Sequence, residues 1–497
     1  MAFRLTALSL IALATLTLSQ VSCAYPAPEA PEPVLLNNAD GQYNHWNGIG
    51  LMFREGRRWC TASLMDTRDA NNVATGPAYI LTNAHCALIV SGTSTSAPFK
   101  GQIQFNFFQD TQENAKRYDI EKVNWASLAN ADVAIMELNA SLETLLKDGI
   151  TPLKLASKAP AKPGPINVVG APAVAPFIRL STCTQEPTKT TLIKYMTVHT
   201  DYQKHDCKGI APGSSGSPVI DPKTGEMVGV LSGTTYGISD DDVCFWHALC
   251  GNEKKKSILP NQASHSFPVD YLAQCFSSGR FTIDHPRCTL SPNFNFKSER
   301  NADIALHKAP IMPTDKAPTW DVEFSMSTAF YRFKTVQDAQ ACFAADHYSG
   351  PISTANAKIE APIGRKPGLY YLCLIGVDSA EQRPSAGLRS NTQILTARLV
   401  EPGTTTLRGM EITQVVFDGY MSVKYRKREE YSRNIWTQQY TLRAGETTCP
   451  DTQYKGYESV DSGFMFRLDH LPVTVCLYNM DRNFNTSAIT QYVVENP

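Results

Sequence analysis

Short apolar runs dominate the chain from residue 46 onward, and each run is bounded by Gly, Asn, Asp or Pro. Short runs between turn-forming residues are typical of β-strands, because helices need longer segments with an apolar repeat of three to four residues. The clearest runs in the first part of the chain cover residues 48–53, 59–65, 78–82, 102–108 and 131–138. The pattern predicts an all-β protein, with one helix expected over residues 267–276.

The same pattern indicates how the chain divides. A polar, proline-rich break at residues 158–165 separates two groups of runs, and Gly225 is expected to form the turn of a hairpin between the runs 219–220 and 227–231. Beyond Pro292 the β pattern contains a repeat, in which a cysteine is followed by a strand that carries a second cysteine. We expect two β-sandwich repeats there, over residues 293–401 and 402–497.

The first 42 residues differ from this pattern. Residues 1–24 have one charge at Arg4, an almost unbroken apolar run and a small-residue end, which is typical of a signal peptide too short to span a membrane. Residues 25–42 are rich in proline and are expected to form an extended leader, with its role as an inhibitory propeptide left open. We expect a secreted or periplasmic protein without a transmembrane span. A retained anchor and a lipid on Cys23 are the alternatives.

The net charge limits the classes of binding partner, and the cysteine content indicates the cellular compartment. The net charge of −1 over 497 residues gives no field that would attract nucleic acid or an anionic membrane. Of the thirteen cysteines, Cys23 lies in the signal segment, and the remaining even number fits six disulfides formed in an oxidising compartment. The stretch 244–250 holds two cysteines and His247 but no fourth ligand nearby, so we expect a disulfide there and no metal or cofactor.

Three separate segments carry candidate chemistry. The turn Gly-Ser-Ser-Gly-Ser-Pro at residues 213–218 projects a serine, which becomes a nucleophile only beside a base. His85 follows a strand and is the type of side chain that accepts a proton near neutral pH, although a structural histidine is the alternative. Asp132 begins a strongly apolar strand, where a buried carboxylate must either pair with a neighbour such as an imidazole or cap a turn.

Taken together, residues 43–288 resemble the chymotrypsin-like (trypsin-fold) serine peptidases. Residues 60–65 are similar to the family's Cys-Gly-Gly-Ser-Leu-Ile, 81–86 to its Thr-Ala-Ala-His-Cys, 132–135 to its Asp-Ile-Ala-Leu and 213–218 to its Gly-Asp-Ser-Gly-Gly-Pro. The resemblance implies two β-barrels with the site between them, in which Ser215 attacks the scissile carbonyl, His85 transfers the proton and Asp132 orients the imidazole. It also implies that the N–H groups of Gly213 and Ser215 form the oxyanion hole.

The resemblance further implies a substrate-binding strand at Ser232, Gly233 and Thr234 and a specificity position at Gly209, where trypsin-like members have Asp. We therefore expect small or apolar side chains at P1, unless the acidic run 240–242 lines the pocket. Ser214 stands where most of the family has the Asp that receives a new amino terminus, so that activation switch is expected to be absent. The nucleophile motif is closest to the bacterial glutamyl-endopeptidase and HtrA-like branches.

The cysteines are expected to pair within domains, although the sequence alone leaves their connectivity open. The resemblance implies the disulfide beside the catalytic histidine, between Cys60 and Cys86. Closeness in sequence suggests Cys275 with Cys288, and the two repeats suggest one disulfide in each sandwich. The remaining cysteines leave Cys183 with Cys207 and Cys244 with Cys250. The expected pairs are Cys60–Cys86, Cys183–Cys207, Cys244–Cys250, Cys275–Cys288, Cys342–Cys373 and Cys449–Cys476. The strands around the repeat cysteines resemble fibronectin-III or immunoglobulin-like modules of bacterial surface proteins, which implies a spacer or a site for a surface or protein ligand.

The sequence thus predicts a secreted serine endopeptidase with two sandwich domains, acting on a protein or peptide substrate. The alternative is a catalytically silent homologue that serves as a cell-surface binding or adhesion protein, through the cleft or the sandwiches.

Overall fold

The structure is a computed structural model and is almost entirely β. Within the residues that it describes, no helix is long and apolar enough to cross a membrane. The described residues are 30–87, 92–173, 175, 177–188, 192–194, 197–200, 202–234, 250–251, 263–290, 294–298, 305–384, 391–401, 411–417, 419–426, 435–452, 456–460, 463–481 and 485–496. The expected signal peptide and the acidic run 240–242 lie outside these residues.

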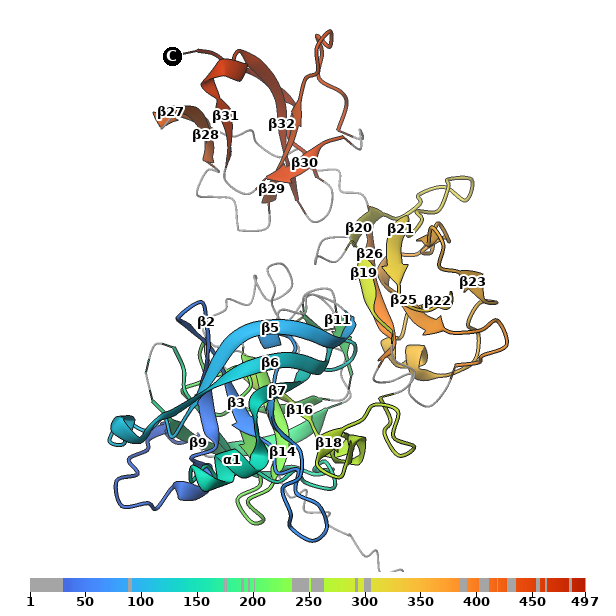
Figure 1. The fold of residues 1–497 in the computed structure, drawn as a ribbon. Coiled ribbons are helices and arrows are strands. Elements are labelled where there is room, and N and C mark those ends of the chain that lie inside the picture. Colours follow the sequence, from blue (N-terminus) through green and yellow to red (C-terminus); the bar gives the residue numbers. More distant parts are fainter. Residues whose placement is uncertain are drawn as a thin grey trace, which may run out of the picture.

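The first barrel is closed by six antiparallel strands in the order β2-β3-β4-β7-β6-β5 (Figure 1). Alternate residues of each strand point inward, as the period of two requires, and bury side chains such as Met52, Ile80 and Met136. A short helix, α1 (Leu142–Lys147), follows the last strand and is capped by Ser141. The strands are β2 (Ile49–Arg54), β3 (Arg57–Leu64), β4 (Pro77–Thr82), β5 (Thr93–Phe105), β6 (Lys116–Ser127) and β7 (Val133–Ser141).

The second barrel begins after the proline-rich break and also has six strands, closed by the pairing of β8 with β9. β13 and β14 form the expected hairpin, with Gly225 at a positive φ of 71° in its turn. The strands are β8 (Gly164–Gly170), β9 (Arg179–Thr188), β12 (Tyr202–His205), β13 (Pro218–Ile220), β14 (Met227–Thr234) and β16 (Ser264–Pro268). A separate small sheet has the strand order β11-β10-β15 and consists of β10 (Leu192–Lys194), β11 (Thr197–His199) and β15 (Cys250–Gly251).

The helix expected over residues 267–276 is wrong in part. Phe267 belongs to β16, and a 3-10 helix, η4 (Asp270–Cys275), follows it. The buried residues Val269, Leu272 and Cys275 are three apart, which matches the three-residue turn of a 3-10 helix. The hairpin β17 (Phe276–Ser277) and β18 (Arg280–Phe281) comes next.

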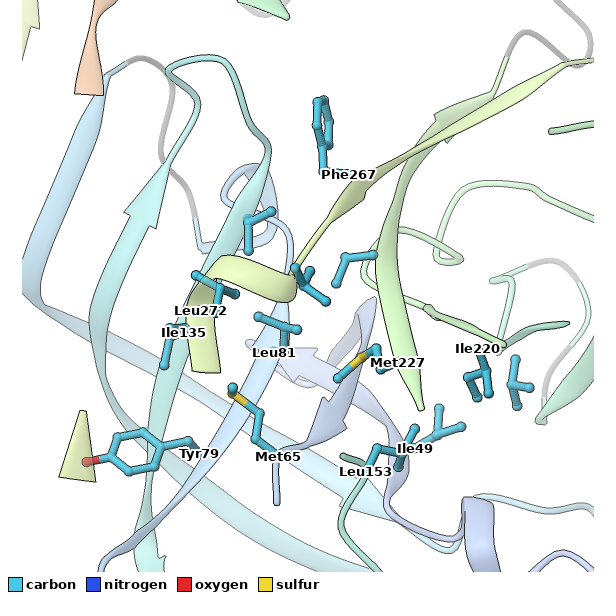
Figure 2. Packing of buried hydrophobic residues seen from close by; sticks show 14 of the residues in the cluster. Ile49, Met65, Tyr79, Leu81, Ile135, Leu153, Ile220, Met227, Phe267 and Leu272 are labelled. Carbon is cyan, nitrogen blue, oxygen red and sulfur yellow. The ribbon is translucent and has the colours of Figure 1, made fainter. Parts of the chain in front are cut away.

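A shared apolar core joins the two barrels. Figure 2 shows Leu81 and Ile135 from the first barrel on the same cluster as Ile220 and Met227 from the second, with Leu272 of η4 beside them. Because both barrels lose water-exposed apolar surface at this contact, it fixes how they sit against each other.

Part of the predicted leader is packed into the second barrel. β1 (Val34–Leu35) pairs with β9, and Leu36 is fully buried in the core between the barrels. Ala30 is buried in a second cluster inside the second barrel. Asn38 and Ala39 donate their backbone N–H groups to the carboxylate of Asp110 at 2.7 and 2.8 Å. Residues 30–39 are therefore held in place by the peptidase region.

Each C-terminal repeat contains two sheets around a buried cluster, as a sandwich requires. The first repeat, yellow to orange in Figure 1, combines the sheets β19-β21-β24 and β20-β26-β25-β22-β23. Its strands are β19 (Phe296–Ser298), β20 (Ala305–Lys308), β21 (Val322–Met326), β22 (Phe330–Val336), β23 (Ile352–Ser353), β24 (Lys358–Ile359), β25 (Gly368–Val377) and β26 (Gln393–Val400).

The second repeat, red in Figure 1, combines the sheets β27-β28-β31 and β30-β29-β32-β33. Its strands are β27 (Glu411–Phe417), β28 (Tyr420–Arg426), β29 (Ile435–Thr441), β30 (Glu458–Val460), β31 (Gly463–Arg467), β32 (Val473–Asp481) and β33 (Thr490–Val494). The described residues hold five disulfides; Cys244, the partner expected for Cys250, lies outside these residues. The five are Cys60–Cys86, Cys183–Cys207, Cys275–Cys288, Cys342–Cys373 and Cys449–Cys476.

Candidate active site

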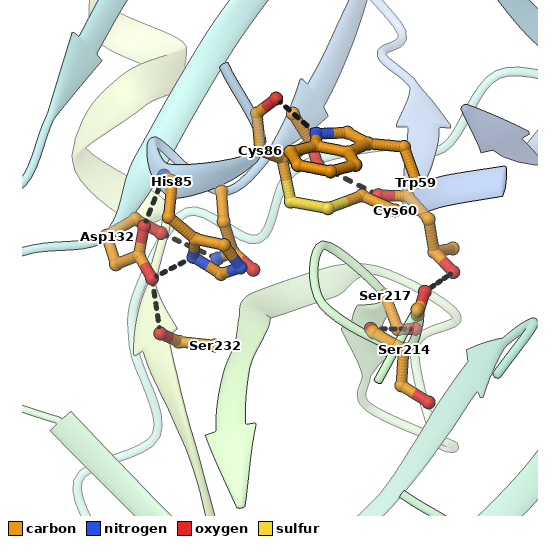
Figure 3. The surroundings of a disulfide bond; sticks show 12 residues. Trp59, Cys60, His85, Cys86, Asp132, Ser214, Ser217 and Ser232 are labelled. Carbon is orange, nitrogen blue, oxygen red and sulfur yellow. Dashed lines mark hydrogen bonds and ion pairs between the residues drawn. A yellow bond between two sulfur atoms is a disulfide. The ribbon is translucent and has the colours of Figure 1, made fainter. Parts of the chain in front are cut away.

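The first barrel brings His85 and Asp132 together at the ends of two paired strands. Thr82 at the end of β4 is the register partner of Ala134 near the start of β7, so the residues just beyond each strand are neighbours. His85 Nδ1 lies 2.7 Å from Asp132 Oδ2, and the His85 backbone N–H donates to Oδ1 at 3.1 Å. Since Nδ1 faces the carboxylate, the other ring nitrogen points away from it and toward the turn that carries Ser214 (Figure 3).

Asp132 is a fully buried carboxylate whose hydrogen-bonding capacity is used by its neighbours. Besides the two groups of His85, the Ser232 hydroxyl donates to Oδ2 at 2.6 Å. A buried charge is costly unless it is paired and hydrogen-bonded, and these three donors supply that compensation. Ser232 belongs to β14 of the second barrel, so this hydrogen bond also joins the two barrels at the site.

Ser232 is predicted from the sequence as part of the substrate strand, but its contact with Asp132 is not. Ser232 lies at an irregularity of β14, where the register against β16 shifts between Leu231 and Gly233. Such a bulge breaks the regular alternation of side chains, so the sequence pattern gives no signal for this contact. Gly233 and Thr234 lie at the end of β14, where their register partners on β16 are His265 and Ser264. The Ser264 hydroxyl donates to the Thr234 hydroxyl at 3.0 Å.

The serine turn is fixed by the first barrel through its backbone. Thr61 N–H donates to the Ser215 carbonyl at 2.8 Å, and the Thr61 hydroxyl donates to the Gly213 carbonyl at 3.0 Å. Gly216 has a φ of +85°, and a Cβ there would lie 2.0 Å from the Thr61 carbonyl oxygen. Only glycine fits at that position, so the turn can approach the first barrel closely.

The orientation of the peptide group between Pro212 and Gly213 leaves the Gly213 N–H available to a ligand. The Pro212 carbonyl accepts from Ala173 N–H at 2.8 Å, and a planar trans peptide directs its N–H and C=O to opposite sides. The Gly213 N–H therefore points away from Ala173. Among the described residues, neither this N–H nor that of Ser215 donates to another group of the protein.

Neutral hydrogen bonds stabilise the turn around Ser214. The Ser214 side chain is buried and accepts from Ala211 N–H at 3.3 Å, while the Ser217 hydroxyl donates to the Ser214 carbonyl at 2.6 Å. Figure 3 shows Ser214 and Ser217 within the turn, opposite the His85–Asp132 pair. No carboxylate stands at Ser214, so the turn is not built around an ion pair at this position.

The Ser215 side chain is half-buried, and no hydrogen bond joins its hydroxyl to His85 among the contacts of the described residues. Catalytic contacts of this kind are often long before substrate binds. Gly209, the expected specificity position, has a φ of +75° and lies against the leader, because a Cβ there would be 2.4 Å from Pro33 Cγ.

Within the part of the chain that the structure describes, two clusters have the residue types of a metal site. Cys60, His85 and Cys86 form one, and Cys183, His205 and Cys207 form the other. In both, the two cysteines are joined as a disulfide, so they offer no thiolate to a metal. Burial lowers the pKa of His205 to about 3, which keeps this imidazole neutral in the folded protein.

Comparison with known proteins identifies the class. Residues 68–230 match the family model of the trypsin-like peptidase domain, a range that includes His85, Asp132 and Ser215. The chain therefore contains a trypsin-like peptidase domain, as the resemblance in its motifs predicts. A comparison with curated proteins finds no match.

Solved structures with similarity to the chain are distant in sequence. The MamO protease domain from Magnetospirillum magneticum shares 11% identity over 46% of this chain and 94% of its own, with a TM-score of 0.30. The protease Anisep from Arthrobacter nicotinovorans shares 15% identity over 48% of this chain and 92% of its own, with a TM-score of 0.28. A two-domain fibronectin type-III segment from chicken tenascin shares 9% identity over 38% of this chain and 98% of its own, with a TM-score of 0.13.

Proposed function

We propose that this protein is a serine endopeptidase that hydrolyses peptide bonds through an acyl-enzyme on Ser215. His85 takes the proton from the Ser215 hydroxyl as the oxygen attacks the scissile carbonyl, and then gives that proton to the leaving amine. Asp132 holds the Nδ1–H tautomer and stabilises the imidazolium that forms. Water then repeats the attack on the acyl-enzyme and releases the second product.

The observation that carries this proposal is the His85–Asp132 pair, with 2.7 Å between Nδ1 and a fully buried carboxylate. A histidine with only a structural role would not require a buried carboxylate at one ring nitrogen while the other ring nitrogen faces a serine turn. The N–H groups of Gly213 and Ser215, which donate to no other group among the described residues, support the proposal further. Backbone donors of this kind stabilise the negative oxygen of a tetrahedral intermediate, and one such donor is typically worth about 3 kcal/mol.

The test compares Ser215→Ala with Ser214→Ala in the purified full chain, with denatured casein as substrate. Ser215→Ala is expected to abolish cleavage because it removes the attacking oxygen. Ser214→Ala is the matched control, one residue away, and is expected to keep substantial activity because its hydroxyl only accepts one backbone hydrogen bond. Loss of activity in Ser214→Ala alone would show that the nucleophile is assigned one residue too late.

The missing hydrogen bond between Ser215 and His85 favours one second candidate, a silent homologue that binds targets without cleaving them. Under that function, the wild-type chain would bind but not turn over denatured casein, with or without residues 1–29. Any turnover that depends on both Ser215 and His85 excludes it.

Location and specificity follow as parts of the same proposal. The five disulfides indicate an oxidising compartment, which agrees with export directed by residues 1–24. We propose a preference for small or apolar P1 side chains, since Gly209 supplies no charge, and a binding role for the sandwich domains. Cleavage profiling on a peptide library tests the P1 preference directly, and a dominant cleavage after Arg, Lys or Glu would contradict it.

A further inference from the structure

Three consecutive buried residues connect the first sandwich domain with the active-site region. Val198 of β11 lies in an apolar cluster with Cys342, Cys373 and Ile394, which belong to the outer face of the first sandwich. His199 faces the opposite way and packs against Phe267 of the second barrel, with 4.8 Å between ring centroids and the rings tilted by 56°. In Figure 1, β11 lies at the edge of the barrels nearest to β26, and the two strands are in contact.

Thr200, the third residue, contacts the segment that leads into Asp132. Its backbone N–H and its hydroxyl both donate to Asn130 Oδ1, at 2.8 and 2.9 Å. Asn130 has a φ of +53°, a left-handed conformation that asparagine tolerates better than most residues. The hydrogen bonds to Thr200 therefore stabilise a strained position two residues before Asp132.

The first sandwich also contacts the other side of this segment. The Thr93 hydroxyl donates to the Phe294 carbonyl at 3.0 Å, and Gly92 packs against Phe296 of β19. Leu128 N–H donates to the Gly92 carbonyl at 2.8 Å. Residues 128–131, all of them buried, thus lie between Gly92–Thr93 on one side and Thr200 on the other. Gly92 and Thr93 contact the first sandwich directly, and Thr200 follows Val198, which packs against it.

We propose that Thr200 is a positioning residue for Asp132 and that the docked first sandwich stabilises it there. This inference rests on the proposed function. The sandwich then has a role in catalysis besides any ligand of its own, because it fixes the segment that presents the carboxylate to His85. Interior contacts of this kind transmit displacement, since a close-packed core cannot deform at one point alone.

The first measurement is steady-state kinetics of full-length variants on a short peptide substrate. Thr200→Val keeps the shape but removes the hydroxyl, and is expected to lower kcat roughly five- to tenfold with KM unchanged. Thr200→Ser restores the donor and most of the kcat. Val198→Asp, which puts a charge into the buried cluster, is expected to lower kcat as well. The matched control is Val415→Asp, because Val415 in the second sandwich is 54% exposed.

The second measurement is hydrogen exchange, which does not depend on turnover. Thr200→Val and Val198→Asp are expected to speed exchange of the His85 backbone N–H and of residues 128–131, but not of residues 142–150 around α1. A chain without any turnover would contradict the proposed function, while exchange would still test the connection. Wild-type kcat together with wild-type exchange in Thr200→Val would overturn the inference.

Discussion

The two halves of the candidate site are built in different ways. The half from the first barrel consists of side chains, in which Asp132 and His85 contact each other directly. The half from the second barrel consists mainly of backbone, in which Gly213 and Gly216 let the serine turn approach Thr61. The first half should therefore be broken by a change of functional group, and the second by adding a side chain where none fits.

The largest effects are expected in the first half. Asp132→Asn keeps the size of the side chain but offers an amide where His85 needs a carboxylate. The Nδ1–H tautomer of His85 is then no longer favoured, and the imidazolium has no counter-charge. In trypsin-like enzymes with a Ser-His-Asp triad this substitution lowers kcat by about 10⁴-fold, and we expect a loss of that order. Single-turnover kinetics on a peptide ester measure it. A loss of tenfold or less would mean that Asp132 has only a structural role.

The next effect tests the second half by adding one methyl group. Gly216→Ala puts a Cβ 2.0 Å from the Thr61 carbonyl, so the turn must move away from the first barrel. We expect nearly complete loss of activity together with a lower melting temperature. Gly225→Ala is the matched control, because Gly225 also has a positive φ, of 71°, but no atom within 4 Å of the added carbon.

Gly225→Ala should cost only about 1 kcal/mol of unfolding free energy, from backbone strain, and leave kcat unchanged. If the two variants lost activity equally, strain alone and not close approach to Thr61 would explain the Gly216 result.

A smaller effect is expected at the hydrogen bond that joins the halves. Ser232→Ala removes the donor at 2.6 Å from Asp132 Oδ2 and leaves the other contacts of the carboxylate in place. A hydrogen bond to a charged group is worth about 1.5–3 kcal/mol, which corresponds to a loss of roughly 10- to 100-fold in kcat. Ser232→Thr keeps the hydroxyl and serves as the comparison. Unchanged kcat in Ser232→Ala would show that the first barrel orients Asp132 without help.

The smallest effect on activity at neutral pH concerns a buried base in the second barrel. Burial lowers the pKa of His205 to about 3, against about 6.5 in an unfolded chain. Between these values the unfolded state binds the extra proton, so the contribution of neutral His205 to stability is complete above pH 6.5 and declines as the pH falls.

The slope is half its maximum at pH 6.5 and approaches about 1.4 kcal/mol per pH unit below it, so acidification from pH 6.5 to 5 should cost roughly 1.5 kcal/mol. Urea unfolding at several pH values measures this cost. His205→Gln should flatten the profile without changing kcat at pH 7, and an unchanged profile would contradict the burial argument.

The sequence predicts the site best where the functional residues lie at the ends of strands. The short apolar runs predict the strands, and because β4 and β7 pair, His85 and Asp132 must be neighbours once both strands form. The hairpin at Gly225 follows from local turn preferences in the same way. These features depend on residues close in sequence or on one strand pairing.

Contacts between distant segments were not predictable from the pattern. Nothing in the tripeptide that begins at Ser232 shows that its hydroxyl reaches Asp132. The proline-rich composition around residue 36 likewise hid Leu36, which is buried in the core between the barrels. The contact of Val198 with the first sandwich depends on how two domains pack. Such contacts arise from tertiary burial, which overrides local preference.

The central claim, that Ser215 is the nucleophile activated by His85, is tested most directly by covalent labelling. A serine-directed phosphonate should react with the wild-type chain, and mass spectrometry of the digested adduct should place it on Ser215. Ser215→Ala and His85→Ala should not be labelled, whereas Ser214→Ala should be. An adduct on Ser214, or labelling that persists without His85, would contradict the account.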